Sequence, residues 1–465
     1  MWGVGTMTEV PVTAHPLARL GLNAGSRALV LGLGKTGLSV ARFLSRQGIP
    51  LAVVDTRESP PGLSELQECL PDVAVFLGGF DQAAFAAATH LVVSPGIGMD
   101  NPAVVQAVQM GLPAFGDVDL FACMAKAPVI AITGANGKST VTTLVGLMAE
   151  AAGRRVKVGG NLGEPMLDLL DEDADLYVLE LSSFQTERAS LLEPAVATVL
   201  NISPDHMDRY PDIAAYAEAK RRIFKGQGVM VLNADDPMVV SMAEPGRTVT
   251  WFGLDEGAEP APEYGLKRKD GADWLTVRGE PWLATAEIRI KGRHNLANAL
   301  AALALGEAAG LPREAMLTAL RKFAGLDHRM QWVAEIDGVS WINDSKATNI
   351  GACIAALEGL EGPVVLIAGG DGKGADFAPL APVAQGKLRA AVLMGRDAPL
   401  LEKILSPVVE TARVGGMSEA VAAARRMAQA GDTVLLAPAC ASLDQYKDYQ
   451  ERGRMFAEAV RGLKP

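Results

Sequence analysis

The chain has 465 residues, of which 49% are hydrophobic and 21% are charged, and its formal net charge is −11. A chain of this length is expected to form about three domains. The acidic balance and the lack of a long basic run exclude an extended nucleic-acid-binding surface, and no apolar run reaches the ~18–20 residues that would span a bilayer.

The N-terminus and the cysteines favour a cytoplasmic protein. Residues 1–24 read as a loose extension, with Met1 and Met7 both possible starts, and they carry no signal-peptide pattern. The four cysteines form no CxxC pair and no disulfide-like spacing, which fits a reducing compartment.

The first predicted globular segment begins with a glycine-rich turn between two strands. The strand Arg27–Leu31 runs into Gly-x-Gly-x-x-Gly at residues 32–37, a helix follows, and the strand Leu51–Val54 ends in Asp55. This β-α-β pattern is the dinucleotide fingerprint, but the same turn can hold any diphosphate. An NAD-dependent oxidoreductase and another diphosphate-binding protein therefore both stay open. The turn Ser94–Gly98 after the next strand is either a ligand loop at the same sheet edge or a plain connection.

A second glycine loop lies near residue 134 and predicts a phosphate site. The apolar strand 127–132 leads into Gly-x-x-Gly-Lys-Ser, and a helix-forming segment follows over residues 141–152. Loop amides and the positive helix end face phosphate, Lys138 adds charge, and Ser139 can ligate Mg²⁺. The full pattern wants a further glycine at position 132, which is Ile132.

Candidate metal ligands follow the next strands. Glu180 ends an apolar strand, where an acid of a phosphate-loop protein faces Mg²⁺. His206 lies between two aspartates after another strand. It is either a metal ligand or part of a solvated turn. Asn161 offers an amide in a tight turn, either to a ligand or to the turn itself. Lys220, on the helix 213–224, reads as an exposed lysine.

The last part of the chain predicts a second open parallel sheet. Before it, the segment 292–298 starts an alanine-rich helix, and its two asparagines are expected to be exposed, contacting an adenine or capping the helix. From residue 328 strands and helices alternate. Positive and polar groups suited to an anionic substrate lie near the strand ends: Arg329, Lys346, Lys373 and Ser442. Together with the phosphate loop, they predict an ATP-driven ligase with one domain for each reactant.

The ordered motifs resemble the Mur ligase family from about residue 25 to the end. They comprise the turns at 32–37 and 55–57, the loop at 133–140, and the stretches 180–185, 205–209, 294–298, 344–349, 370–373 and 438–445. Within the family, the blocks 344–349 and 441–445 resemble the members that add D-glutamate. The implied fold is α/β with three domains: a Rossmann-like domain over 1–125, a central P-loop ATPase-type domain over 126–327 and a Rossmann-like domain over 328–465.

The resemblance implies an ATP-dependent ligase of peptidoglycan biosynthesis. It would join D-glutamate to UDP-N-acetylmuramoyl-L-alanine through an acyl phosphate and release ADP and phosphate. It would act in the cytoplasm as a monomer, with no nucleic acid and no membrane span. The alternative is a Mur-type or folylpolyglutamate-type ligase that adds a different amino acid. The residues implied for the UDP substrate replace the NAD interpretation: Lys35, Thr36, Asp55, Thr56, Arg57, Gly96 and Asn161.

The resemblance also implies three further groups of site residues. ATP would be held by Gly134, Ala135, Asn136, Gly137, Lys138, Ser139, Thr140, Asn295, Asn298, Arg329 and Asp344. D-Glutamate would be held by Lys346, Thr348, Lys373, Ser442, Leu443 and Tyr449. Catalysis and two Mg²⁺ ions would use Lys138, Ser139, Glu180, His206 and Lys220, the last carbamylated by CO₂. Ala135 and Tyr449 depart from the threonine and phenylalanine that are familiar there.

Overall fold

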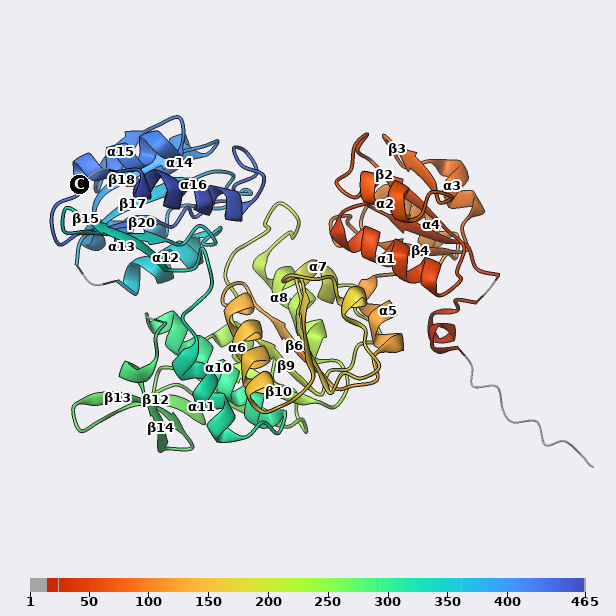
Figure 1. Cartoon of the computed structure of the whole chain (residues 1–465), viewed down its shortest axis with the longest axis horizontal. Coiled ribbons are helices and arrows are strands. Elements are labelled where there is room, and N and C mark those ends of the chain that lie inside the picture. Colours follow the sequence, from red (N-terminus) through yellow and green to blue (C-terminus); the bar gives the residue numbers. More distant parts are fainter. Residues whose placement is uncertain (1–14, 24, 291, 361, 464–465) are drawn as a thin grey trace, which may run out of the picture. The chain divides into compact units, whose positions relative to one another are not determined.

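The computed structural model describes residues 15–23, 25–290, 292–360 and 362–463. Three sheets of five, nine and six strands are flanked by helices, so the predicted α/β fold class is confirmed (Figure 1). The chain divides into two compact units. The first consists of the chain up to Pro128 with Gly159–Ala174 and Phe184–Glu193, and the second of Val129–Val158, Asp175–Ser183 and Pro194–Pro465. The domain boundaries near residues 125 and 327 stay predictions.

The first unit is built on a five-stranded parallel sheet of order β3-β2-β1-β4-β5. Its strands are β1 (Ala28–Leu31), β2 (Leu51–Asp55), β3 (Ala74–Leu77), β4 (His90–Val93) and β5 (Ala114–Phe115). Its helices are α1 (Lys35–Arg46), α2 (Leu63–Cys69), α3 (Gln82–Ala87), α4 (Pro102–Gln109), α5 (Asp117–Met124) and the short η2 (Met166–Leu169). Leu29 and Leu31 of the central strand pack against α3 and α4, because strands of a parallel sheet are covered by helices.

The expected loose N-terminal extension is wrong for the part that is described. Residues Pro16–Leu20 form the short helix η1, and Leu17 and Leu22 are fully buried. Burying these two leucines stabilises the segment, since each removes apolar area from water. Residues 1–14 and 24, which include Met1 and Met7, lie outside the described part of the chain.

The second unit begins with a nine-stranded sheet of order β14-β13-β12-β11-β10-β9-β6-β8-β7. Its strands are β6 (Val129–Thr133), β7 (Val156–Gly160), β8 (Leu176–Glu180), β9 (Val196–Val199), β10 (Val229–Asn233), β11 (Val249–Phe252), β12 (Tyr264–Lys269), β13 (Ala272–Val277) and β14 (Glu280–Ala284). β12 pairs antiparallel with β13, and β13 pairs antiparallel with β14.

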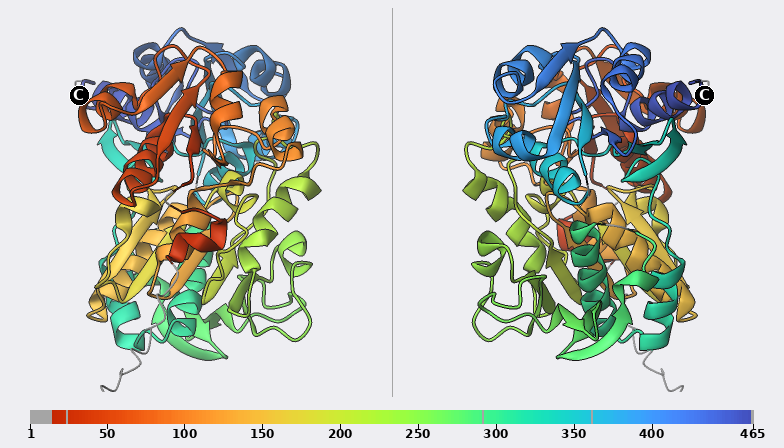
Figure 2. Two further views of the ribbon diagram at one scale, coloured as in Figure 1. Left: turned by 90° about the vertical axis from the view of Figure 1, so that its right-hand side faces the viewer. Right: turned by 90° about the vertical axis from the view of Figure 1, so that its left-hand side faces the viewer.

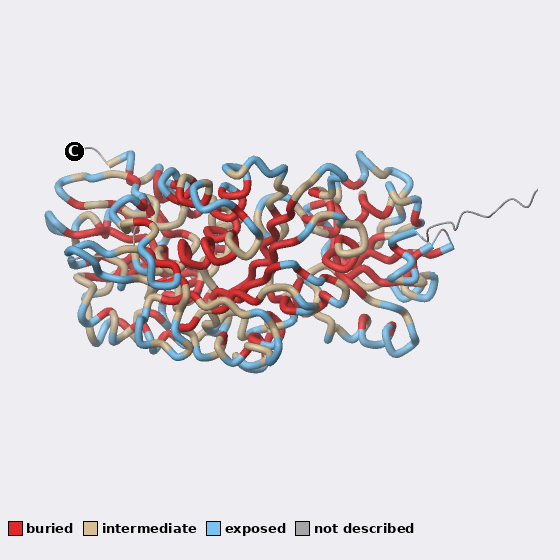
Figure 3. Tube along the Cα trace, turned by 90° about the horizontal axis from the view of Figure 1, so that it is seen from below, coloured by how far each residue is buried: buried red, intermediate tan, exposed pale blue. Residues whose placement is uncertain are grey.

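Helices cover the central strands of this sheet. They are α6 (Lys138–Ala151), α8 (Ile213–Arg221), η3 (Arg222–Phe224), α9 (Pro237–Val240), η4 (Thr285–Glu287), α10 (Arg293–Ala308) and α11 (Arg313–Lys322). The short helix α7 (Ser183–Thr186) begins at the last residue of one segment of the second unit, and its other residues belong to the first unit. Ile130 and Ile132 of β6 belong to one buried cluster with residues of α6, α10 and α11. Figure 3 shows buried stretches of the chain in red and exposed stretches in pale blue along the Cα trace.

A six-stranded sheet of order β15-β16-β20-β17-β18-β19 completes the second unit, and it is called the third sheet below. Its strands are β15 (Gln331–Ile336), β16 (Val339–Asn343), β17 (Val364–Gly369), β18 (Leu388–Met394), β19 (Glu410–Arg413) and β20 (Thr433–Leu436). Its helices are α12 (Ile350–Glu358), α13 (Leu380–Lys387), α14 (Ala398–Leu405), α15 (Met417–Met427) and α16 (Tyr449–Arg461). The edge strand β15 is antiparallel to β16, so the sheet departs from the fully parallel prediction at that edge.

Alternate residues of β17 face opposite layers of helices in this sheet. Leu366 packs in one cluster with residues of α12, α13 and α14, whereas Val365 packs in another with residues of α15 and α16. Successive side chains of a strand point to opposite faces, which explains why β17 is apolar throughout. Figure 2 shows these helices in blue on both sides of the sheet.

Two glycines of the first turn provide a matched test of close packing. A Cβ on Gly37 would lie 1.8 Å from the carbonyl oxygen of Gly32, whereas a Cβ on Gly34 would have no neighbour within 4 Å. We expect Gly37→Ala to lower the free energy of unfolding of the first unit by at least about 2 kcal/mol, because α1 must move away from β1. Gly34→Ala should change it by less than about 0.5 kcal/mol. Denaturant unfolding measures both, and equal effects would contradict this packing.

Candidate active site

Three loops meet at the carboxyl edge of the sheet in the first unit. The backbone N–H of Leu33 donates to Oδ2 of Asp55 at 2.7 Å, and Oγ of Ser94 donates to the carbonyl of Gly32 at 3.0 Å. The predicted ligand turn at 94–98 therefore lies at the same edge as the glycine turn. Lys35 and Thr36 are the first two residues of α1, directly after the glycine turn. A Cβ on Gly96 would have no neighbour within 4 Å.

Asp55 is buried, and Arg57 pairs with it. The Arg57 guanidinium donates to both carboxylate oxygens, at 2.9 and 2.7 Å. Burial raises the pKa of Asp55, but hydrogen bonds from Arg57 and Leu33 outweigh it and leave the pKa below its usual value. Thr56 and Asn161 are exposed, each in the first unit. The backbone amides of the glycine turn suit a diphosphate, and the ionised Asp55 suits a sugar hydroxyl as a hydrogen-bond acceptor.

Arg188 shapes the 94–98 loop, and sequence reasoning missed it. Its guanidinium is buried and donates to the carbonyls of Val93, at 3.2 Å, and of Ile97. The sequence indicates this role only by placing an arginine eight residues after Glu180, the end of a predicted strand.

The phosphate loop of the second unit is held open by one asparagine. Gly134 and Gly137 have φ values of 150° and 83°, which side chains rarely adopt. Asn201, at the end of the neighbouring strand region, accepts from the N–H of Asn136 through Oδ1 at 2.8 Å and donates to the carbonyl of Asn136 at 3.1 Å. Its own carbonyl accepts from the N–H of Ala135 at 2.9 Å. The sequence analysis assigned no role to Asn201, because the predicted strand ran over residues 197–202, whereas β9 ends at Val199.

Lys138 lies over the loop at the first position of α6. Its ammonium donates to the carbonyls of Gly134 and Ala135, both at 2.8 Å. Burial lowers the pKa of Lys138, while the carboxylates of Glu180 and Asp205 oppose that effect. The neighbouring Ser139 and Thr140 are buried in the first turn of the helix. A cation, a helix N-terminus and glycine amides therefore face the same point, as phosphate binding requires.

Glu180 and Lys220 are both buried next to this loop. Glu180 is the last residue of β8, pairs in register with Ile132 of β6, and is 2% exposed. Lys220 is 1% exposed, so its expected exposure on the surface of α8 is wrong. The Nζ of Lys220 lies 3.4 Å from Oγ1 of Thr133 and 4.5 Å from the ring centre of Tyr216.

The environment of Lys220 favours its neutral amine. Burial has the largest effect and lowers the pKa far below the ordinary value, and the charge of Lys138 adds to it, although Asp205 and Glu180 oppose both. A neutral amine is nucleophilic, which a surface lysine at neutral pH is not.

Asp205 connects the two sheets of the second unit. It forms an ion pair with Lys373 and accepts from the Asn349 amide at 3.3 Å, and His206 Nε2 lies 3.8 Å from it. Burial raises the pKa of Asp205, but the charge of Lys373 and its hydrogen bond outweigh that effect and set the pKa at about 2. Burial lowers the pKa of His206 to about 4, so its imidazole is neutral, as a metal ligand must be.

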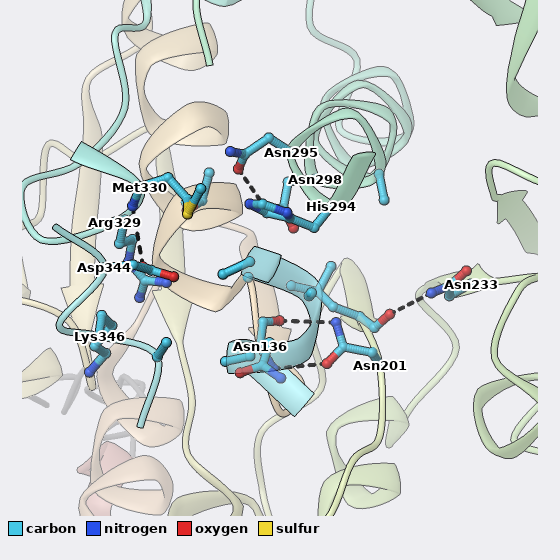
Figure 4. A pocket seen from close by; sticks show the side chains of 18 of the residues that line it. Asn136, Asn201, Asn233, His294, Asn295, Asn298, Arg329, Met330, Asp344 and Lys346 are labelled. Carbon is cyan, nitrogen blue, oxygen red and sulfur yellow. Dashed lines mark hydrogen bonds between the residues drawn. The ribbon is translucent and has the colours of Figure 1, made fainter. Parts of the chain in front are cut away.

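A pocket of about 140 Å³ lies between the phosphate loop, α10 and the start of the third sheet. Figure 4 shows Arg329, Asp344 and Lys346 at one end, and the amides of Asn136, Asn201, Asn295 and Asn298 toward the other. Its remaining wall is largely apolar, and includes Leu200, Phe252, Met330, Ala352 and Ala356. Such a lining suits a flat heteroaromatic group with donors and acceptors at its rim.

The two asparagines of α10 are buried, so their predicted exposure is wrong. The helix begins at Arg293, within the segment predicted to start it, and Asn295 and Asn298 are 9% and 8% exposed. The α10 N-cap is Gly292, so neither asparagine serves as the cap. A Cβ on Gly137 would lie 2.3 Å from Oδ1 of Asn298, which explains why the loop needs glycine there.

Arg329 and Asp344 form the charged end of the pocket. Nη2 of Arg329 donates to Oγ of Ser139 at 2.7 Å, and Asp344 accepts from the N–H of Met330 at 3.2 Å. Burial raises the pKa of Asp344 to about 6, although Arg329 acts against that rise.

The residues predicted to hold an amino acid lie in the loops of the third sheet. Lys346 Nζ lies 4.0 Å from the ring centre of Tyr449. Burial lowers the pKa of Lys346 to about 8. Ser442 is buried in the loop after β20, while the adjacent Leu443 is 72% exposed. Thr348 is half-buried in the segment before α12. Lys346 and Tyr449 are thus in contact, whereas Lys373 is bound to Asp205.

Several non-glycine residues around the site have left-handed backbone conformations. These are His206, His328, Met330, Lys373 and Ala439, with φ between 44° and 63°. Such conformations are costly for residues with a Cβ, and they persist only where the surroundings fix them.

No group of three or more His, Cys, Asp and Glu side chains suited to a metal ion occurs among residues 15–463 as described. The nearby donors are Ser139, Glu180 and His206. Mg²⁺ commonly binds through one or two protein ligands and completes its coordination with water and phosphate oxygens. The donor set therefore fits Mg²⁺ only together with a phosphate ligand.

Comparison with known proteins covers most of the chain. Residues 26–116 match the Mur ligase MurD-like N-terminal domain, residues 132–306 the Mur ligase middle domain, and residues 328–440 the Mur ligase glutamate ligase domain. A protein of Methylococcus capsulatus named UDP-N-acetylmuramoylalanine–D-glutamate ligase is 66% identical over 445 residues, 96% of each chain. The chain belongs to the Mur ligase family.

Further Mur ligase relatives agree with this assignment. A protein of Nitrosococcus oceani with the same name is 55% identical and covers 94% of this chain and 96% of its own. Among solved structures, a pseudomurein peptide ligase type C of Methanothermus fervidus has a TM-score of 0.62 at 19% identity, covering 95% of this chain and 100% of its own. A UDP-N-acetylmuramate–alanine ligase of Thermotoga maritima has a TM-score of 0.60 at 19% identity, covering 94% and 100%. These two structures support the fold of this Mur ligase.

None of the described helices of this Mur ligase combines the length and the apolar character that crossing a bilayer requires.

The pKa of Asp344 predicts how nucleotide affinity depends on pH. Its folded-state pKa of about 6 lies above the ordinary value, so the carboxylate is ionised at pH 7 and becomes protonated as the pH falls through about 6. We expect the affinity for ADP to fall over this range more steeply in the wild type than in Asp344→Asn. Calorimetric titration between pH 5 and pH 8 measures both slopes, and the variant shows the part due to titration of ADP itself. Parallel slopes would contradict a role for Asp344 as an ionised acceptor.

Proposed function

We propose that this Mur ligase joins D-glutamate to UDP-N-acetylmuramoyl-L-alanine, with conversion of ATP to ADP and phosphate, in peptidoglycan biosynthesis. Relatives at 66% and 55% identity carry the name of this activity. The structural observation that supports it is a pocket lined both by the phosphate loop and by Arg329, Asp344 and Lys346. One pocket thereby joins a nucleotide site to the loops of the third sheet, as an ATP-driven ligase requires.

Each reactant is assigned to one group of loops. The UDP substrate is assigned to the sheet edge of the first unit, with Lys35, Thr36, Asp55, Thr56, Arg57, Gly96 and Asn161. ATP is assigned to the phosphate loop and the asparagine-lined pocket, whose amides and apolar wall suit adenine. D-Glutamate is assigned to the loops of the third sheet, where lysines suit its two carboxylates: Lys346, Thr348, Lys373, Ser442, Leu443 and Tyr449.

The proposed reaction has two chemical steps. The L-alanyl carboxylate attacks the γ-phosphorus of ATP, ADP leaves, and an acyl phosphate forms. The amine of D-glutamate then attacks the acyl carbon, and the tetrahedral intermediate collapses to an amide with loss of phosphate and a proton. Lys138 and the loop amides neutralise the charge of the transferred phosphoryl group, because they are already oriented toward that position.

Mg²⁺ would be held by Ser139, Glu180 and His206, and a second ion by a carbamate on Lys220. When bound, these ions supply Lewis-acid stabilisation of phosphate charge. The neutral imidazole of His206 is already in the ionisation state that metal binding needs, and Glu180 is buried beside the same loop.

Lys220 is proposed to react with CO₂. The neutral amine attacks the carbon of CO₂ and loses a proton, which leaves a carbamate anion in place of a neutral amine. The depressed pKa of Lys220 supports this step, because only the unprotonated amine can attack. The carbamate would also add a negative charge near the side chain of Lys138.

We further propose that the enzyme acts in the cytoplasm as a monomer. The main alternative is a Mur-type or folylpolyglutamate-type ligase for a different amino acid, because lysines and a serine would also bind other anionic acceptors.

Phosphate release separates these possibilities. With ATP, Mg²⁺ and UDP-N-acetylmuramoyl-L-alanine, we expect D-glutamate to stimulate release far more than L-glutamate, L-lysine, glycine or D-alanine. Lys138→Ala should lower the D-glutamate-dependent rate by at least about a hundredfold, because a charge-stabilising group is lost from the transition state. Lys126→Ala, at an exposed lysine before the same strand, is the matched control. Stimulation by another amino acid, or an active Lys138→Ala enzyme, would contradict the proposal.

Lys220 provides a separate test that does not depend on turnover. Incubation with ¹³C-labelled bicarbonate should give a carbamate carbon signal in the NMR spectrum of the wild type. The signal should be absent from Lys220→Arg, because a guanidinium does not become neutral at this pH. The exposed Lys35 is left intact in both proteins and serves as an internal control. A signal of equal size in both proteins would contradict a carbamate on Lys220.

A further inference from the structure

Arg452 is fully buried in α16, and it contacts several loops of the third sheet. Its Nε donates to Oγ of Ser345 at 3.0 Å and its Nη2 to the carbonyl of Ser345 at 2.8 Å. Its Nη1 donates to the carbonyl of Cys440 at 3.1 Å and lies 3.5 Å from that of Gly369. Among the described ion pairs none includes Arg452. The guanidinium is therefore satisfied by backbone and hydroxyl oxygens.

The three contacted segments follow three adjacent strands. Ser345 lies just after β16, Gly369 ends β17, and Cys440 lies just after β20, and these strands are neighbours in the order β16-β20-β17. Figure 1 shows α16 beside this sheet. Each segment leads directly to a residue assigned above to D-glutamate: Lys346 after Ser345, Lys373 after Gly369, and Ser442 after Cys440. One side chain thus fixes the relative positions of three substrate loops.

These loops have backbone conformations that require external support. Gly369 and Gly370 have φ of 120° and 131°, and Lys373 and Ala439 have φ of 53° and 58°. Left-handed conformations of residues with a Cβ persist where the surrounding structure imposes them. Hydrogen bonds from a buried cation are stronger than neutral ones, so Arg452 is the contact best suited to impose these conformations.

Only arginine meets the geometric demand at this position. Its planar guanidinium presents five N–H donors in a fixed fork, whereas a lysine ammonium presents three donors at a single point. Burial lowers the pKa of Arg452 to about 10, so the group remains charged at neutral pH. The first turns of α16 add two contacts to the same segment: Ser345 Oγ donates to the carbonyl of Tyr449 at 2.8 Å, and Asn343 donates to that of Gly453 at 2.9 Å.

We propose that Arg452 is a positioning residue that sets the spacing of Lys346, Lys373 and Ser442 for D-glutamate. The inference rests on the proposed function, because it concerns the amino-acid site of that reaction. Arg452 does not touch the substrate, since its donors are occupied by backbone and hydroxyl oxygens inside the domain. Its loss should therefore weaken D-glutamate binding through the loops, while the phosphate loop and the sheet edge of the first unit keep their geometry.

The test compares Arg452→Lys and Ser345→Ala with Arg389→Lys in the full-length enzyme. Arg389 pairs with the buried Asp432 through two hydrogen bonds, at the amino edge of the same sheet. It is thus a matched arginine of the same sheet, away from the loops. For each protein we would measure the thermal midpoint and the KM values for D-glutamate, ATP and UDP-N-acetylmuramoyl-L-alanine.

Arg452→Lys should raise the KM for D-glutamate by roughly tenfold or more, with the other two KM values within about twofold, because several charge-assisted hydrogen bonds are lost. Ser345→Ala should raise the same KM by roughly threefold, since it loses one acceptor of Arg452. Arg389→Lys should lower the thermal midpoint and leave all three KM values unchanged.

The outcomes separate the inference from the function on which it rests. A wild type whose phosphate release does not depend on D-glutamate overturns the proposed function, and the inference falls with it. A D-glutamate-dependent wild type with an unchanged D-glutamate KM in Arg452→Lys overturns the inference alone, as does an equal rise of all three KM values. If Arg452→Lys does not fold, Ser345→Ala decides by the same criterion.

Discussion

Positive charge that is buried near two carboxylates governs the chemistry of the second unit. Asp205 and Glu180 both act on Lys138 and Lys220, and burial lowers the pKa of each lysine. Buried charges that are incompletely paired reduce the free energy of unfolding unless a ligand compensates them. Although the whole chain has a net charge of −11, this edge places the ammonium of Lys138 where burial disfavours its charge, and an anionic ligand would compensate that cost.

The sequence features that could be predicted are local. A glycine turn after a strand, an acid at a strand end and a lysine at a helix start are set by neighbours within a few residues. For that reason the phosphate loop, Glu180 and the turn at 94–98 were found at the carboxyl edges where strand–helix alternation puts them. The fold class followed from the same alternation.

Features that depend on packing between distant segments could not be predicted. Lys220 reads as exposed because α8 is short and rich in alanine, and only the position of Tyr216 and Thr133 shows which face is buried. Asn201 and Arg452 bind backbone groups that lie 65 and 107 residues away, for which no periodic pattern exists. The antiparallel pairing of β15 with β16 was not predicted for a related reason, since strand–helix alternation indicates parallel strands and a short hairpin leaves no helix between its strands.

The asparagine-lined part of the pocket has a consequence for inhibitor chemistry. Asn136, Asn201, Asn295 and Asn298 offer donors and acceptors without net charge, next to a wall of small apolar side chains. Recognition at this end depends on shape and amide complementarity, and the charged contacts lie at the other end. An uncharged, flat compound that satisfies these amides would occupy the pocket without a triphosphate mimic. It would thereby avoid the poor membrane permeability that multiply charged nucleotide analogues carry.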